Sequence, residues 1–219
     1  MRQGDNRQRV GKRSKGSRLS AMPELLQRDI TGVILIGGKS RRMGRDKAFL
    51  EVAGQPLFEI VLELFREHFD RVLLVGNREE RFAPYGLPVV PDIYPGSSLG
   101  GLYTGLHHAE TDHVFVSSCD LPYPNAEVLR YLCSLKDGYD AVVPSTSYGY
   151  EPLFALYSKS SLAPIRAQLE KGEFCAFAYY PQISIRYVSP EELAPFDRDG
   201  RAFLNLNTPQ EYAKIGEKS

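Results

Sequence analysis

The sequence predicts an α/β fold in which helices cover both faces of a mostly parallel sheet. Short, nearly continuous apolar runs end in glycine or polar residues, a pattern typical of buried parallel strands. Between these runs lie stretches whose apolar residues recur at helical spacing. An alternation of strands and helices is the order of βαβ units, which indicates a three-layer domain with its ligand site at the carboxyl ends of the strands.

In the first half of the chain, the apolar run ITGVILI at residues 30–36 predicts a strand that ends at Gly37 and Gly38. A helix is expected to begin at Pro56, because proline is favoured in a first turn. Its apolar residues recur at helical spacing: Leu57, Ile60, Val61, Leu64 and Phe65. The other elements expected in this half are strands at 71–75, 88–90 and 113–118 and a helix at 100–109.

In the second half, a helix is expected over residues 125–135, with Asn125 as its N-terminal cap. A closing helix is expected to begin at Thr208 and Pro209, in the favoured order of a cap followed by proline. The remaining elements expected here are strands at 140–143, 152–157 and 183–188 and a helix at 160–171.

The composition is that of a globular protein: 219 residues, 42% apolar, with 27 basic and 27 acidic residues. A chain of this length is expected to form one domain, and it can bury a sizeable core without disulfides. No run approaches the roughly 20 apolar residues of a membrane span. The three cysteines are widely spaced and form no CxxC motif, so we expect neither a disulfide framework nor structural zinc, and a cytoplasmic location.

The balanced net charge conceals a basic N-terminal arm. Residues 1–20 carry seven Lys or Arg and one acid, which leaves 20 basic and 26 acidic residues elsewhere. The arm has no apolar stretch, which excludes a signal peptide, and no aromatic residue to stack on a base, so we do not expect it to bind nucleic acid. We expect residues 1–28 to be a disordered extension, or sequence upstream of the true start, and residues 29–219 to be the functional domain.

The most informative segment is LIGGKSRRMGRDKAFL at residues 35–50, a strand that runs into two glycines and a basic loop. Glycines let the backbone approach a phosphate and present amide hydrogens to it. Five cations match a polyphosphate, whose charge must be neutralised before it is attacked. They are Lys39, Arg41, Arg42, Arg45 and Lys47. The loop is not a Walker motif, because Val33 stands where its first glycine should be, and no dinucleotide G-x-G-x-x-G follows the strand.

The second informative segment is SSCDLP at residues 117–122, which ends a predicted strand. A carboxylate such as Asp120 at the end of an apolar strand is well placed to ligate magnesium between phosphates. On its own, an aspartate after a strand is more often a turn former. The basic glycine loop on the same predicted sheet edge favours the metal-binding role. The aromatic residues at 148–157 and in the CAFAYY run at 175–180 are expected to be core or pocket wall.

These segments resemble the molybdenum cofactor guanylyltransferases, a branch of a larger nucleotidyltransferase superfamily. The superfamily shares a glycine-rich loop that ends in R-M-G and is followed by a lysine, here Lys47. Further matches occur in the same order along the chain: GQPL at 54–57, VGNRE at 75–79, PD at 91–92, CDLP at 119–122, EPLFALY at 151–157 and NLNTP at 205–209. The resemblance extends from about Ile30 to Ile215 and implies a Rossmann-like, three-layer nucleotidyltransferase fold.

The resemblance also implies an activity: transfer of GMP from GTP to molybdopterin, with release of pyrophosphate and with Mg²⁺ as cofactor. GTP and molybdopterin would be the substrates, and transient partners would be other proteins of cofactor biosynthesis or the molybdoenzymes that receive the product; no membrane partner is implied. The residues implied for the nucleotide site are Leu35, Ile36, Gly37, Lys47, Asn77, Asp92 and Asp120. Asp120 is the implied metal ligand, and Asn205 and Asn207 lie toward molybdopterin.

Lys47 and Asp120 are the candidate catalytic residues, to which we add Arg42 from its charge and position. The molybdopterin phosphate is already ionised, so no catalytic histidine is needed. The turn PGSSLGG after Asp92 departs from the Gly-Pro-Leu sequence usual in the family, and position 36 is Ile where Ala is commoner. Two other functions stay open. One is a cytidylyltransferase that acts on molybdopterin or an isoprenoid precursor. The other is a non-catalytic protein that binds a nucleotide or cofactor.

Overall fold

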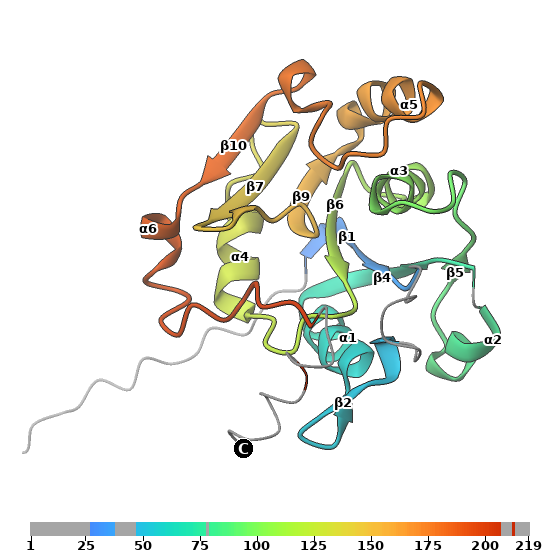
Figure 1. The fold of residues 1–219 in the computed structure, drawn as a ribbon, viewed down its shortest axis with the longest axis vertical. Coiled ribbons are helices and arrows are strands. Elements are labelled where there is room, and N and C mark those ends of the chain that lie inside the picture. Colours follow the sequence, from blue (N-terminus) through green and yellow to red (C-terminus); the bar gives the residue numbers. More distant parts are fainter. Residues whose placement is uncertain (1–26, 38–46, 78, 207–211, 213–219) are drawn as a thin grey trace, which may run out of the picture.

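The computed structural model describes residues 27–37, 47–77, 79–206 and 212, except for the side chains of Lys47 and Glu79. Its main sheet has the order β10-β7-β9-β6-β1-β4-β5 (Figure 1). These strands are β1 (Gln27–Leu35), β4 (Phe69–Val75), β5 (Val89–Val90), β6 (His113–Ser118), β7 (Ala141–Thr146), β9 (Phe154–Ser158) and β10 (Ile185–Val188), with β8 (Gly149–Tyr150) paired to β7. A separate hairpin joins β2 (Glu51–Val52) and β3 (Gln55–Pro56).

The sheet is mostly parallel, as the sequence predicts. Strand β1 pairs in parallel with both β4 and β6, β5 pairs in parallel with β4, and β10 pairs in parallel with β7. Strand β9 runs antiparallel between β6 and β7. Its amino end therefore lies at the edge where β6 ends, so residues just before β9 share that edge with residues just after β6.

Helices cover both faces of the sheet and enclose two apolar clusters. Helices α1 (Leu57–His68) and α4 (Ala126–Ser134) pack on one face, and α3 (Ser98–His108) and α5 (Leu162–Glu170) pack on the other (Figure 1). Strand β1 alternates between them, with Ile30 and Ile34 in the first cluster and Val33 and Leu35 in the second. Because both faces are covered, the strand is apolar throughout, and this is why its sequence lacks the alternation of a half-exposed strand.

The expected strands and helices within the described residues are all present, and most have shifted ends. The strand expected at 30–36 begins at Gln27, inside the segment that we assigned to the arm. The helix expected at 160–171 begins as a 3₁₀ turn, Lys159–Ser161. The closing helix lies outside the described residues apart from Tyr212. Short elements that the sequence did not predict are the β2–β3 hairpin, β8, the helices α2 (Glu79–Phe82) and α6 (Pro190–Leu193), and the 3₁₀ turns Lys47–Phe49, Ala83–Tyr85 and Tyr180–Gln182.

Two side-chain caps explain why particular helices begin where they do. Asn125 Oδ1 accepts hydrogen bonds from the amides of Glu127 and Val128, which confirms it as the cap of α4. Ser189 caps α6 in a capping box, with Glu192 accepting from the Ser189 amide in return.

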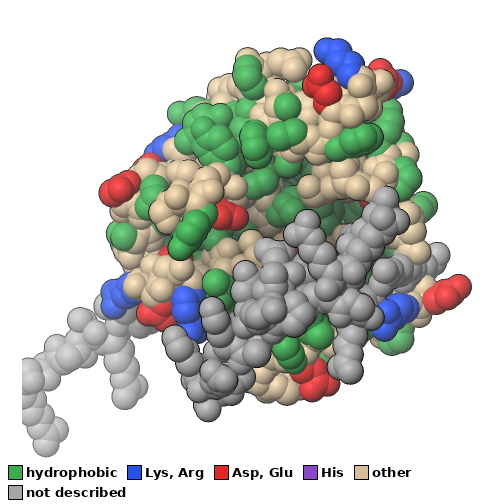
Figure 2. Space-filling model, viewed as in Figure 1, with side chains coloured by type: hydrophobic (Ala, Val, Ile, Leu, Met, Phe, Trp, Pro, Cys, Tyr) green, Lys and Arg blue, Asp and Glu red, His purple; other side chains and the backbone are tan. Residues whose placement is uncertain are grey.

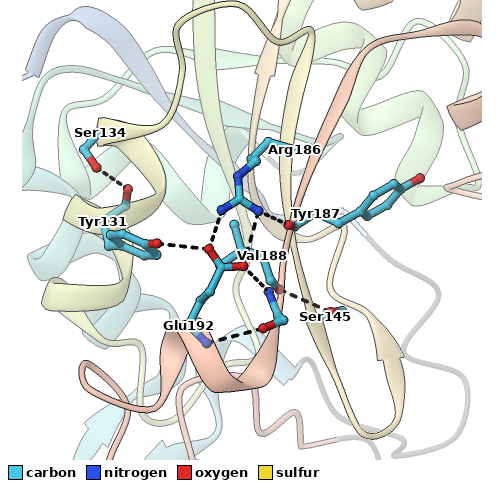
Figure 3. Close-up of polar contacts among 8 residues, drawn as sticks. Tyr131, Ser134, Ser145, Arg186, Tyr187, Val188 and Glu192 are labelled. Carbon is cyan, nitrogen blue, oxygen red and sulfur yellow. Dashed lines mark hydrogen bonds and ion pairs between the residues drawn. The ribbon is translucent and has the colours of Figure 1, made fainter.

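A polar network ties the C-terminal part of the chain to the rest of the fold (Figure 3). Arg186 on β10 pairs with Glu192 on α6, and this guanidinium holds the pKa of the Glu192 carboxyl below its usual range. The Tyr131 hydroxyl on α4 donates to the same carboxylate at 3.3 Å. Ser145 on β7 donates to the carbonyl of Val188 at 3.2 Å. The network anchors the start of the segment that later returns to the sheet edge at Asn205.

Among the residues that the structure describes, no helix has the length and apolar character needed to cross a membrane.

Candidate active site at the carboxyl ends of the strands

A cavity of about 900 Å³ opens at the carboxyl ends of β1, β4, β5 and β6. Figure 2 shows one face of the molecule, on which hydrophobic and uncharged polar surface occupies the upper centre and most coloured charged side chains lie toward the periphery. The described lining includes seven residues expected from the sequence to bind nucleotide, metal or molybdopterin: Leu35, Ile36, Gly37, Asn77, Asp92, Asp120 and Asn205. The fold thus brings together side chains that are far apart in the sequence, as the strand-end positions predict.

Asp92 lies just after β5 and is held by the neighbouring turn. Its backbone N–H donates to Asn77 Oδ1 at 3.1 Å. A Cβ atom added to Gly37 would lie 3.2 Å from Asp92 Oδ2, and one added to Gly101 would lie 3.6 Å from Oδ1. The two glycines therefore let the backbone of the β1 end and of α3 approach the carboxylate closely. Among the described residues, Asp92 Oδ1 is buried and makes no hydrogen bond, and burial raises the pKa of this carboxyl.

Helix α3 fixes the turn that carries Asp92. The Thr104 hydroxyl accepts from the amide of Ile93 at 3.0 Å and donates to the Gly100 carbonyl at 2.9 Å. The Ser97 hydroxyl accepts from the Gly100 amide and begins the helix. A Cβ atom on Gly100 would lie 1.9 Å from the carbonyl oxygen of Tyr94, so only glycine permits this approach. The turn after Asp92, which departs from the usual family sequence, is thus held in place by the Ser97 and Thr104 hydroxyls.

Asp120 follows β6 in the middle of the same edge. Its carbonyl accepts from the Leu206 amide at 3.2 Å, which brings the adjacent Asn205 to the cavity. The Asn205 amide group donates to the Phe203 carbonyl at 3.2 Å, so its side chain is oriented locally. This contact joins a segment near the C-terminus to the central strand of the site.

Asp120 suits a cation that takes most of its ligands from the substrate and from water. No group of three or more His, Cys, Asp or Glu residues that could hold a metal ion occurs in the described parts of the chain. A closed, all-protein metal site is therefore not formed by these residues. Magnesium is commonly bound by one or two carboxylates together with substrate phosphates, and Asp120 on the cavity wall can supply one such carboxylate.

Glu151 is a cavity residue that the sequence analysis did not assign. It precedes β9, and its amide donates to the Pro144 carbonyl at 2.9 Å. The Thr146 hydroxyl lies 3.2 Å from Glu151 Oε1 and 3.3 Å from the Gly149 carbonyl, and it can donate to either. Burial raises the pKa of the Glu151 carboxyl, and the Thr146 hydrogen bond offsets this only in part. The signal was present in the EPLFALY motif, but only the antiparallel placement of β9 brings it to the site.

Of the basic loop at residues 39–47, only the end lies within the described residues. The backbone of Lys47 lies in the 3₁₀ turn Lys47–Phe49, next to Ala48, which lines the cavity. Arg42 and Asn207 lie outside the described residues, as do Lys39, Arg41 and Arg45.

The aromatic residues expected to be core or pocket wall divide into two groups. Tyr157, Tyr179 and Tyr180 are buried, as expected. Tyr148, Tyr150 and Phe177 are 97%, 45% and 48% exposed and do not line the cavity, so their assignment to the core or pocket wall was wrong. For Tyr148 and Tyr150 the reason is that they lie in the β7–β8 hairpin, which extends beyond the part of β7 that pairs with β9 and β10.

The fold and the cavity define an α/β protein with a ligand-sized cavity at one sheet edge, where carboxylates lie close to Gly37 at the end of β1. Residues 32–182 match the family described as "MobA-like NTP transferase domain". The chain belongs to this family.

Its relatives match over nearly the whole domain. It is 38% identical to a protein of Pelotomaculum thermopropionicum named "Probable molybdenum cofactor guanylyltransferase", over 84% of this chain and 90% of the relative. It is 36% identical to the "Molybdenum cofactor guanylyltransferase" of Syntrophotalea carbinolica, over 84% and 89%. The crystal structure of molybdopterin-guanine dinucleotide biosynthesis protein A from Archaeoglobus fulgidus superposes with a TM-score of 0.76 at 27% identity, covering 85% of this chain and 97% of that one.

Proposed function

We propose that this protein transfers GMP from GTP to molybdopterin and releases pyrophosphate, which forms the guanine dinucleotide form of the cofactor. One observation carries the proposal: a single cavity presents Asp92 and Asp120 at the ends of β5 and β6, beside the glycine end of β1. The family of the chain and the names of its relatives support the same reaction.

The guanine base is expected to bind at Asp92. An ionised carboxylate only accepts hydrogen bonds, and guanine presents N1–H and its 2-amino group side by side as two donors. The pair of oxygens can therefore be satisfied together. Gly37 and Gly101 line the cavity together with Asp92, and their lack of side chains supports the binding of a planar base there.

The phosphates are expected to extend from Gly37 toward Asp120. A non-bridging oxygen of the molybdopterin phosphate attacks the α-phosphorus of GTP, and the bond from that phosphorus to the oxygen bridging to the β-phosphorus breaks. Pyrophosphate leaves with the electron pair of that bond. The attacking oxygen is already ionised, so no proton has to be removed, and positioning and charge neutralisation account for most of the catalysis. Lys47 and Arg42 neutralise the triphosphate in this proposal.

Asp120 is the proposed ligand of a divalent cation, Mg²⁺. When bound, the ion supplies positive charge to the triphosphate and to the departing pyrophosphate. Asn205 and Asn207 are proposed to lie on the molybdopterin side, and the contact of Leu206 with the Asp120 carbonyl supports this for Asn205. Transient contact with other cofactor-biosynthesis proteins or with molybdoenzymes that receive the product belongs to the same proposal.

The decisive experiment measures pyrophosphate release with GTP, CTP, ATP and UTP, each with and without molybdopterin. The proposed activity requires release with GTP that depends on molybdopterin and on a divalent cation. Preference for CTP would instead indicate the cytidylyltransferase. Nucleotide binding without pyrophosphate release would indicate a non-catalytic protein.

A further inference from the structure

We propose that Glu151 forms a second base-recognition site, in which its carboxylate accepts hydrogen bonds from the N3–H and the 2-amino group of a pterin ring. The inference rests on the proposed function, because that function supplies a pterin as the second substrate. Asp92 would recognise the guanine end of the product and Glu151 the pterin end.

The order of the strands supports the assignment. Asp92 follows β5, Asp120 follows β6, and Glu151 precedes β9, which lies beside β6 on the side away from β5. The phosphate chemistry proposed at Asp120 thus lies between the two other carboxylates. From β5 to β9 there are four interstrand steps of about 4.8 Å, or about 19 Å in all. A dinucleotide with a base at each end and phosphates in the middle has the same order of parts.

The surroundings of Glu151 suit a flat, uncharged ring. The cavity wall beside it is formed by Pro152, Leu153, Phe154 and Phe203. Phe154 and Phe203 meet edge to face with ring centroids 5.9 Å apart. None of the described lining residues is Lys or Arg, so none of them forms an ion pair with the Glu151 carboxylate. An apolar wall with one acceptor group is the usual composition of a site that orients a heterocycle.

The carboxylate is not needed to hold the hairpin together. The backbone does this, through the Glu151 amide to the Pro144 carbonyl at 2.9 Å and the Phe154 amide to the Glu151 carbonyl at 3.3 Å. Thr146 is the one described side chain within hydrogen-bond distance of the carboxylate, and its hydroxyl is shared with the Gly149 carbonyl. The carboxylate therefore keeps capacity for further donors, and it is half-buried, where unmet acceptors are costly.

The chemistry selects a particular class of ring. The pyrimidine half of a pterin carries a 2-amino group next to N3–H, the same pair of donors that guanine presents, and a carboxylate matches the pair with its two oxygens. Replacing the 2-amino group with an oxo group, as in a lumazine, turns one donor into an acceptor that faces the carboxylate. The proposed site must therefore discriminate between pterins and lumazines.

The test uses 6-hydroxymethylpterin monophosphate and its lumazine counterpart as probes, with binding followed by probe fluorescence. The full-length wild type, Glu151→Gln and Glu59→Gln are compared. Glu59 is a matched control. Like Glu151 it is a half-buried glutamate, and it accepts a hydrogen bond from the Tyr85 hydroxyl at 2.7 Å, but it does not line the cavity. Melting temperatures check folding, and Glu151→Ala repeats the measurement if the glutamine variant does not fold.

We expect the wild type and Glu59→Gln to bind the pterin at least tenfold more tightly than the lumazine. Glu151→Gln should lose this preference, and its KM for molybdopterin should rise at least tenfold while its KM for GTP changes less than twofold. A wild type without the preference, or a Glu151→Gln protein that keeps it, would overturn the proposal. A wild type that prefers the pterin through Glu151 but releases no pyrophosphate from GTP and molybdopterin would overturn the proposed function and leave the pterin site standing.

Discussion

Asn77 holds Asp92: the Asn77 side-chain oxygen accepts the Asp92 backbone N–H at 3.1 Å, which joins the turn after β4 to the turn after β5. The backbone continues this connection, with the Gly76 amide donating to the Val90 carbonyl at 2.9 Å. Asn77 is exposed on the cavity wall, whereas its partner is half-buried. Asn77 is therefore suited to orient the carboxylate that we propose for guanine.

Replacing Asn77 with alanine is expected to weaken base selection. Without its acceptor, the Asp92 turn is less constrained, and the preference of kcat/KM for GTP over CTP should fall at least tenfold. The unfolding free energy should fall by only about 0.5–1.5 kcal/mol, the net value of one hydrogen bond. Asn125→Ala is the matched control, since it removes a helix cap worth about 1 kcal/mol but should leave the preference intact. If Asn77→Ala keeps the wild-type preference for GTP over CTP, Asn77 has no part in base selection.

Asp92 is predicted to cause the preference for guanine. Sites that pair a buried polar group with the substrate can discriminate by up to roughly 10⁴–10⁵, because the wrong partner leaves that group unsatisfied. The measurement is kcat/KM for GTP, CTP and ATP in the wild type and in Asp92→Ala. The variant should lose most of the preference for GTP. If it retains the preference, Asp92 only shapes the glycine turn.

Asp92 should also lower stability at neutral pH. Burial raises the pKa of its carboxyl above the unfolded value of about 3.8, so the unfolded chain releases this proton first as pH rises. The penalty is absent below the unfolded pKa and complete above the folded one. Asp92→Asn should therefore melt at a higher temperature than the wild type at pH 7, by about 2–4 °C for each kcal/mol regained, and the difference should vanish near pH 3. An equal or lower melting temperature at pH 7 would contradict this.

Asp120→Asn is expected to abolish turnover while the fold stays intact. Loss of metal-assisted charge stabilisation should cost several kcal/mol in the transition state, so kcat should fall much more than GTP affinity. The rate should be measured across a magnesium titration. Asp137→Asn, an exposed change at the opposite end of the sheet, serves as the control. A near-normal magnesium-dependent rate in Asp120→Asn would remove this residue from the site.

Lys47→Ala is expected to lower activity at least tenfold without a change in melting temperature. A lysine that binds phosphate contributes to the transition state, whereas an exposed lysine typically changes stability by less than about 0.5 kcal/mol. Lys171→Ala, at an exposed position after α5, should change neither quantity. Wild-type kinetics in Lys47→Ala would mean that this lysine is only a solvated surface residue.

Local sequence patterns were sufficient for most of the elements. The strand expected at 113–118 has those bounds in the structure, and Asn125 caps α4 as expected. Both depend on residues adjacent in the chain, since an apolar run or a cap acts over one or two turns. The same local signals place Asp92 and Asp120 just after strands, which was enough to expect them at one sheet edge.

Other features depend on which segments become neighbours. The hydrogen bond from Asp92 to Asn77 and the contact of Leu206 with Asp120 join parts of the chain that no local pattern relates. Glu151 stood in a recognisable motif, yet nothing near it in the sequence indicates that β9 runs antiparallel between β6 and β7. The sequence by itself determined the alternation of elements, the buried character of the strands and the residue types at their ends. Only the tertiary structure decided the order and direction of the strands, because these are selected by the packing of the whole sheet between its two helical layers.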